Sequence, residues 1–195
     1  MKIVYLFGKS ACGKDSIYRK LLADSSLHLR KAVLYTTRPM RDGEEEGREY
    51  HFITPKQEQA LEQQGRVIEK RLYHTVYGPW IYLTADDGQF EGDSCFLMQG
   101  TLESYLSVRD YFGADKVLPV YIEVEDGERL MRAIARERTQ EVPKYREMCR
   151  RFIADDDDFS EENLRRGGVV RRYENIRLDD CVEEIKSSIR EFQGR

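Results

Sequence analysis

Short apolar runs alternate with helically spaced apolar positions along this chain, and the alternation predicts an α/β fold. Residues 2–7, 94–98 and 117–124 are short and almost continuously apolar, as strands buried in a parallel sheet are. Helical spacing of apolar residues covers three further segments, at 15–23, 102–111 and 179–192. Because strands and helices alternate, we expect a parallel sheet core flanked by helices.

The stretch at about 35–90 departs from this alternation and is predicted to form a lobe outside the core. Its strand patterns are short and lie at 32–37, 50–53, 67–72 and 81–84. A helix is expected to begin at Pro55 and to end near Gln64, because proline suits a first helical turn and Gly65 stops the helix. The last two strands are expected to be separated by a turn at Tyr77-Gly78-Pro79.

A second excursion, at about 129–164, has a helical pattern that is interrupted near residues 139–143. It is rich in arginine, with Arg129, Arg132, Arg136, Arg138, Arg146, Arg150 and Arg151. No internal repeat or linker divides the chain. We therefore expect a single domain, 1–195, whose core comprises about 1–34, 91–128 and 165–195.

Composition restricts the classes of protein to which this chain can belong. Of its 195 residues, 35% are charged and 40% hydrophobic, and the mean hydropathy is -0.68, as expected of one globular domain. The net charge of -4 gives no overall basic field, so no nucleic-acid partner is expected. No apolar run approaches the roughly 20 residues that cross a bilayer, and no signal peptide is recognisable. Four cysteines without C-x-x-C spacing favour reduced thiols, and we expect a cytoplasmic protein with no membrane partner.

The most informative short motif follows the first apolar run. Residues 8–14 read G-K-S-A-C-G-K and match G-x-x-x-x-G-K between a predicted strand and a predicted helix, where a phosphate loop belongs. Its glycines let backbone N–H groups turn toward a phosphate, and Lys14 can reach the β- and γ-phosphates of a nucleotide. The core is therefore expected to be of the P-loop NTPase type. The predicted phosphate-binding residues are Gly8, Ser10, Ala11, Cys12, Gly13, Lys14, Asp15 and Ser16.

The position after Lys14 departs from the motif, which places a serine or threonine there as a ligand of Mg²⁺. This chain has Asp15 at that position, followed by Ser16. Either Asp15 contacts the metal directly or through water, which we favour, or it turns away and Ser16 substitutes. Cys12 is either a thiolate favoured by the loop and Lys14 or a small residue that fits the loop, and we favour the second interpretation.

A second anion site is predicted at residues 36–44, which read T-T-R-P-M-R-D-G-E and are followed by Y-H-F at 50–52. Arg38 and Arg41 can aim planar guanidinium groups at one phosphate, and Tyr50 adds a hydroxyl donor. Together with the phosphate loop, this segment resembles the signature of the guanylate kinase family. These nucleoside-monophosphate kinases transfer the γ-phosphoryl group of ATP to GMP. The resemblance covers most of the chain, because the remaining motifs follow in family order.

The resemblance implies an ATP site on the phosphate loop, Mg²⁺ as cofactor, and ATP and GMP as small-molecule partners. The residues it assigns to GMP are Arg38, Arg41, Tyr50, Glu69 and Tyr77. Glu69 is implied to read guanine, because a carboxylate accepts the adjacent N1–H and N2–H₂ donors of that base, and the other four would hold the acceptor phosphate. The resemblance also places residues 173–175 near the adenine of ATP.

Several positions depart from the family pattern. A serine that contacts guanine corresponds to Leu34 or Tyr35, and the serine after Tyr-Gly is replaced by Pro79. Where the family places D-x-D-x-x-G, residues 97–100 read L-M-Q-G and contain no acid. These aspartates help to organise the metal and the acceptor, so their loss gives Asp15 a possible compensating role.

The arginine-rich excursion resembles the lid of the family. Positioned cations stabilise a transferring phosphoryl group, and a mobile lid also expels water. By this resemblance Arg136 and Arg151 are expected to act in catalysis with Lys14, with Arg146 as the alternate. Asp155 to Asp158 cannot all meet one metal ion, because consecutive helical residues point to different sides. We expect them to form a solvated turn or helix face, with pairing to lid arginines as the alternative.

We predict a kinase that transfers the γ-phosphoryl group of ATP to GMP, giving GDP and ADP. One alternative is a kinase of the same family with another phosphorylated acceptor, such as ribose 1,5-bisphosphate. Kinases for that acceptor can carry G-K-D-S, as residues 13–16 do here. Another alternative is a non-catalytic guanylate-kinase-like module that binds protein partners, although such modules typically lose the phosphate loop.

Overall fold

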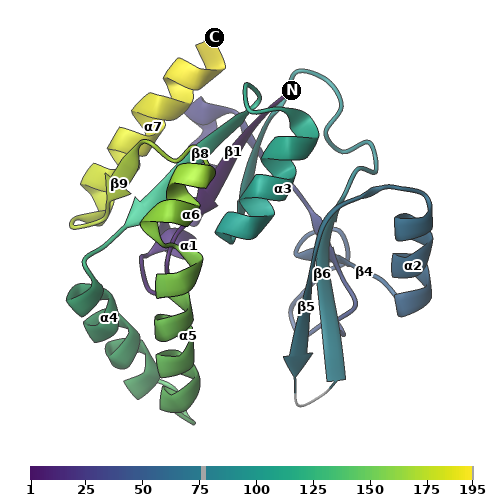
Figure 1. The fold of residues 1–195 in the computed structure, drawn as a ribbon. Helices are drawn as coiled ribbons and strands as arrows, with labels where there is room; N and C mark the ends of the chain where they lie inside the picture. Colours follow the sequence, from purple (N-terminus) through teal and green to yellow (C-terminus); the bar gives the residue numbers. More distant parts are fainter. Residues whose placement is uncertain (76–77, 195) are drawn as a thin grey trace.

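The computed structural model describes residues 1–75 and 78–194, and it contains two sheets with flanking helices (Figure 1). The larger sheet has five parallel strands in the order β2-β7-β1-β8-β9. Their bounds are β1 (Lys2–Phe7), β2 (Leu29–Lys31), β7 (Cys95–Gly100), β8 (Val117–Glu123) and β9 (Arg172–Glu174). The predicted α/β class with a parallel sheet core is therefore confirmed.

Helices cover both faces of this sheet because successive side chains of a strand point to opposite faces. Val4 of β1 belongs to one apolar cluster with Ile17 and Ile185, and Tyr5 belongs to a second cluster with Tyr105. The helices that supply these partners are α1 (Lys14–Ala23), α7 (Leu178–Gly194) and α3 (Leu102–Phe112). A short 3-10 helix, Ser25–Leu27, follows α1. Most residues of the central strands β7, β1 and β8 are buried, as their apolar sequences predict.

The smaller sheet belongs to the segment predicted to lie outside the core, and its strands are β3 (Leu34–Thr36), β4 (Tyr50–Phe52), β5 (Val67–Thr75) and β6 (Gly78–Ala85). They lie in the order β4-β3-β6-β5, and β6 is antiparallel to both of its neighbours. Helix α2 (Pro55–Gln63) begins with a capping box in which Thr54 and Gln57 satisfy each other's backbone N–H groups. This sheet and α2 lie on the side of the molecule away from α7 and β9 (Figure 1).

The predicted helical excursion forms α4 (Asp126–Arg138) and α5 (Tyr145–Asp158), which lie across from the smaller sheet (Figure 1). The expected interruption near residues 139–143 separates them. The short helix α6 (Glu161–Arg166) then leads back to the core. In the described parts of the chain, none of the helices combines the length and apolar character needed to cross a membrane.

Three local predictions differ from the structure. Gly78 and Pro79 lie in β6, where Pro79 pairs with His74, and not in the predicted turn; Tyr77 lies outside the described residues. Strands β2 and β9 were not predicted. Each has only three residues, and in β9 a single buried side chain, Tyr173, stands between charged ones, so no apolar run marks it. Both lie at sheet edges, where pairing needs less apolar surface.

Candidate active site

The phosphate loop connects β1 to α1, and its two motif glycines are required by the local geometry. Gly13 has a φ of 88° and is the residue from which α1 starts, with Ser16 N–H and Ile17 N–H donating to its carbonyl at 3.0 and 3.1 Å. A Cβ at Gly8 would lie 2.5 Å from the Ile122 carbonyl oxygen of β8. The loop can therefore approach the sheet only with glycine at this position.

Asn175 holds the other side of this loop. Its buried side-chain Nδ2 donates to the Cys12 carbonyl at 2.8 Å, and its own N–H donates to Glu123 O at 2.9 Å. A Cβ at Gly13 would collide with the Asn175 amide. Asn175 thus anchors the loop to the end of β8. The sequence resemblance placed residues 173–175 near adenine and missed this contact.

Burial raises the pKa of the Cys12 thiol, and the nearby Lys14 only partly opposes this effect. The side chain is 1% exposed and packs in the core with Ile17 and Leu21. A protonated, buried thiol supports the interpretation of Cys12 as a small residue that fits the loop. It does not match the environment of a reactive thiolate.

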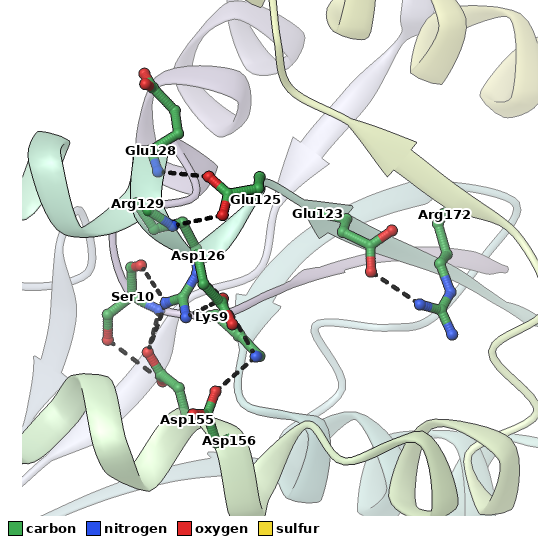
Figure 2. Close-up of polar contacts among 11 residues, drawn as sticks. Lys9, Ser10, Glu123, Glu125, Asp126, Glu128, Arg129, Asp155, Asp156 and Arg172 are labelled. Carbon is green, nitrogen blue, oxygen red and sulfur yellow. Dashed lines mark hydrogen bonds and ion pairs between the residues drawn. The ribbon is translucent and has the colours of Figure 1, made fainter.

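A buried ion-pair cluster joins the phosphate loop to helices α4 and α5 (Figure 2). Arg129 is 0% exposed, and its guanidinium donates to Ser10 O at 3.0 Å, to Asp155 at 3.2 Å and to Asp126 at 2.6 Å. Asp155 in turn accepts the Ser10 N–H at 2.7 Å. The loop backbone is therefore held from both sides by groups of the predicted lid.

The expectation of a solvated aspartate face is wrong for Asp155, which is 8% exposed and pairs with Arg129. Asp156 forms an ion pair with Lys9 at 2.7 Å. The alternative, in which these aspartates pair with lid arginines, is confirmed for Asp155 only. No local pattern predicts this contact, because 145 residues separate Ser10 from its carboxylate partner.

One cleft of about 1100 Å³ runs from the phosphate loop to the smaller sheet and to the lid helices. The predicted site residues that line it are Gly8, Ser10, Ala11, Cys12, Gly13, Lys14, Asp15, Ser16, Tyr50, Arg136 and Arg151. Arg38, Arg41, Glu69 and Arg146 are not among its lining residues, and Tyr77 lies outside the described residues. The structure thus brings the loop, Tyr50 and two lid arginines together.

Lys14 and Asp15 face this cleft, with Lys14 Nζ 3.3 Å from Asp15 Oδ1. Their side chains are 24% and 74% exposed, so both can meet a ligand. Gln99 also lines the cleft, and its buried Oε1 has no hydrogen-bond partner within the described part of the chain. Among the described residues, no group of three or more His, Cys, Asp and Glu side chains could hold a metal ion by itself. Asp15, Ser16 and Gln99, which all line the cleft, have side-chain oxygen atoms, the kind of ligand that Mg²⁺ prefers.

Arg38 lies behind Tyr50 and does not reach into the cleft. It is 3% exposed, its guanidinium is 5.6 Å from the Tyr50 ring centroid, and its Nη1 and Nη2 donate to Glu44 at 2.9 and 2.8 Å. This pair, with a further bond from Arg41 N–H, lowers the pKa of Glu44 to about 2. The Arg41 side chain is exposed. Arg38 and Tyr50 are therefore adjacent, and the Arg38 guanidinium is hydrogen-bonded to Glu44 within the smaller lobe.

Glu69 is engaged on both carboxylate oxygens. Arg71 Nε and Nη2 donate to it at 3.0 and 3.2 Å, and Thr84 Oγ1 donates at 2.7 Å. The Glu69 side chain is 3% exposed, whereas Arg71 lines the cleft. Arg71 was not singled out from the sequence, although it stands two residues from Glu69 and therefore on the same face of β5.

The comparison with known proteins agrees with this arrangement. A family model described as guanylate kinase matches residues 1–191. The chain belongs to the guanylate kinase family. The predicted resemblance is confirmed, and the match extends over both sheets and the lid helices.

Relatives in the guanylate kinase family match this chain over nearly its whole length at low identity. The guanylate kinase of Porphyromonas gingivalis is 23% identical over 195 residues, covering 98% of this chain and 97% of that protein. That of Salinibacter ruber is 26% identical over 192 residues, covering 97% and 96%. The crystal structure of guanylate kinase from Anaplasma phagocytophilum has a TM-score of 0.64 at 18% identity, over 100% of this chain and 87% of that one. The chain is therefore a divergent family member.

The structure explains why a glycine ends this segment. Gly100 corresponds to the final glycine of D-x-D-x-x-G, and a Cβ there would collide with the Tyr5 hydroxyl and would lie 2.5 Å from Ser104 Oγ. These two hydroxyl groups are hydrogen-bonded to each other at 2.8 Å and fill the space. A side chain at position 100 therefore cannot be accommodated without moving them.

Proposed function

We propose that this chain is an ATP-dependent phosphotransferase that moves the γ-phosphoryl group of ATP to the phosphate of GMP, giving ADP and GDP. Membership of the guanylate kinase family supports the proposal, as do relatives of that name matching nearly the full length. One observation carries it: a single cleft joins the phosphate loop and Lys14 to Tyr50 of the smaller sheet and to Arg136 and Arg151 of the lid helices.

In this proposal, the chain acts by positioning and electrostatic stabilisation. The loop N–H groups and Lys14 hold the donor phosphates, and the acceptor oxygen attacks in line with the bond that breaks. Because that oxygen is already anionic, no strong general base and no covalent enzyme intermediate are needed. Arg136 and Arg151 stabilise the charge that spreads over the transferring group.

The cofactor proposed for this reaction is Mg²⁺, held by Asp15 and Ser16 together with the donor phosphates. When bound, it would neutralise phosphate charge. Asp15 has a role of its own in this arrangement. Its carboxylate is paired with Lys14, which offsets the repulsion that an unpaired acid would exert on the phosphates.

The acceptor phosphate is proposed to bind near Tyr50, with Arg38, Arg41 and Tyr77 as further ligands. Arg38 is held by Glu44 before the acceptor arrives. The phosphate therefore has to compete with this carboxylate for the guanidinium. Such an exchange keeps Arg38 ordered in the free protein at the cost of part of its affinity for the acceptor.

We propose one domain, in which residues of about 35–90 form the acceptor lobe and residues of about 129–164 form the lid. Closure of the lid over the cleft would exclude water from the transferring group. A cytoplasmic location is proposed with it, since all four cysteines are free thiols, as in a reducing compartment.

A phosphotransfer assay with ATP and Mg²⁺ tests this function directly. The acceptors are GMP, dGMP, AMP, CMP, UMP and ribose 1,5-bisphosphate. We expect GMP and dGMP to be preferred, and Lys14→Met to lower kcat/KM by at least about 100-fold, because a charge-stabilising group is lost. Lys20→Met, on the same helix and 48% exposed, is the matched control and should leave the rate unchanged. Preference for another acceptor, or activity on none, would overturn the proposal.

A further inference from the structure

In the Glu69–Arg71 ion pair, the arginine lines the acceptor cleft and the glutamate does not. Both Glu69 oxygens already accept hydrogen bonds, from Arg71 and from Thr84, and its side chain is almost fully buried. A carboxylate has about four acceptor sites, and three of those of Glu69 are taken, so it cannot accept both N1–H and N2–H₂ of guanine without releasing one of its present partners. Release of Arg71 would be costly, because its largely buried guanidinium would lose its anionic partner. Glu69 is therefore poorly placed to read the base.

The Arg71 guanidinium has further N–H groups that do not bind Glu69. Glu69 binds the side of the guanidinium formed by Nε and Nη2. The other side, formed by Nη1 and the second N–H of Nη2, has no hydrogen-bond partner among residues 1–75 and 78–194. Its side chain is 18% exposed and lines the cleft. A planar pair of donors is thus available to a ligand.

The charge of this pair favours a neutral ligand edge over a phosphate. Glu69 compensates the Arg71 charge at 3.0 Å, so the pair offers N–H donors without a net positive charge. The surrounding wall is aromatic: Tyr82 lies 5.6 Å from both Tyr50 and Tyr73, measured between ring centroids. Aromatic walls suit a planar base, which can stack on them.

Guanine is the base whose edge matches a planar donor pair. Its O6 and N7 are adjacent acceptors, and a bidentate arginine to these atoms is the commonest specific contact to guanine. Adenine presents N7 beside an N6–H₂ donor, which would oppose a guanidinium N–H. Among the described residues of the smaller lobe, Glu49 is the only acid that lines the cleft, and its carboxylate already accepts from Arg48 and from Glu45 N–H.

We propose that Arg71 determines acceptor specificity by reading the O6 and N7 edge of guanine, with Glu69 as a positioning residue that orients it. This inference rests on the proposed GMP kinase activity. It predicts that the 2-amino group of guanine is unread, because the carboxylates of Glu69 and Glu49 already accept hydrogen bonds from the protein.

Two acceptor analogues test the proposal on the unmodified full chain. IMP keeps O6 and N7 and lacks the 2-amino group, while 7-deaza-GMP replaces N7 by a C–H group. We expect kcat/KM for IMP to stay within about threefold of that for GMP, because an unread amino group contributes little. For 7-deaza-GMP we expect a loss of at least about tenfold, because a hydrogen bond to a charged donor is removed.

Variants then assign the effect to one side chain. In Arg71→Gln, kcat/KM for GMP should fall about tenfold, and the penalty for 7-deaza-GMP should disappear. Glu69→Gln should keep that penalty, since the glutamine still accepts from Thr84 and Arg71 remains the reader. Arg66→Gln, an exposed arginine just before β5, is the matched control and should change neither ratio.

The outcomes separate this inference from the activity on which it rests. If kcat/KM for IMP is more than tenfold below that for GMP, while kcat/KM for 7-deaza-GMP equals that for GMP, the protein recognises the N1 and N2 edge of guanine. The Arg71 proposal is then wrong. Equal use of all three acceptors would also overturn it. A chain inactive on GMP and active on ribose 1,5-bisphosphate would instead refute the proposed function itself.

Discussion

Replacing Arg129 by methionine tests how strongly the lid helices are coupled to the phosphate loop. The guanidinium is fully buried and donates to Ser10 O, Asp126 and Asp155. It also packs over the Phe152 ring, 4.5 Å from its centroid. Methionine keeps most of the apolar length of this side chain but removes its charge and donors.

The magnitude of the effect depends on the groups left behind. Asp155, whose side chain is 12% exposed, would keep only Ser10 as a hydrogen-bond partner among the described residues, and Ser10 O would lose its donor. Asp126 is 51% exposed and can be solvated. Breaking a buried pair by removing one partner costs roughly 3–5 kcal/mol, so we expect a loss of about 3 kcal/mol in the free energy of unfolding.

Urea unfolding at neutral pH, followed by far-ultraviolet circular dichroism, measures this loss. We expect a lower midpoint at an unchanged m-value, because the surface exposed on unfolding is the same. Arg150→Met is the control: Arg150 is 64% exposed on α5, and its loss should change stability by no more than about 0.5 kcal/mol.

A double-variant cycle decides whether the buried charge is the cause. Adding Asp155→Asn to Arg129→Met removes the unpaired carboxylate, so the double variant should recover more than about 1 kcal/mol relative to the sum of the single changes. If Arg129→Met matched the control, or if the two changes were additive, the buried ion pair would not couple the lid to the loop.

Three further predictions address the cleft and its surroundings. Asp15→Ala, which leaves no oxygen ligand at this position, should raise the Mg²⁺ concentration needed for half-maximal rate by about tenfold, as loss of groups around a metal commonly does; an unchanged titration would show that Asp15 is not a ligand. Iodoacetamide should modify the exposed Cys149 well before the buried, raised-pKa thiol of Cys12, as peptide mass spectrometry can establish, and equal rates would contradict the burial argument. The pKa of Glu44 is lowered from 4.5 to about 2, so its pair with Arg38 stabilises the fold above about pH 4.5 and is lost as the pH falls toward 2. Glu44→Gln should therefore lower Tm at pH 7, and the difference in Tm from wild type should vanish near pH 2. A difference in Tm that stays constant with pH would refute this pH dependence.

The core could be predicted because its signals are local. The apolar run of β1 and the glycine spacing after it indicate a buried strand and a phosphate loop from fewer than 15 consecutive residues. Strand β9 lacks such a signal, since only Tyr173 of its three residues is buried. It forms because β8 offers a free edge to pair with.

The groups that hold the loop could not be predicted for the same reason. Arg129 and Asn175 contact it across 119 and 163 residues of sequence. Seven arginines in the excursion have similar neighbours, and nothing in their spacing distinguishes the buried one from the exposed ones. Only the packing of α4 against α5 places Arg129, rather than Arg150, over the loop.

Glu69 shows how a neighbouring residue can change the chemistry that a motif implies. Its spacing from Arg71 puts both on one face of β5, and opposite charges two positions apart on a strand are free to pair. Arg71 is among the residues that line the cleft, whereas Glu69 is not. In our proposal the carboxylate therefore orients the arginine, and residue 71 sets the donor pattern that is offered to a base.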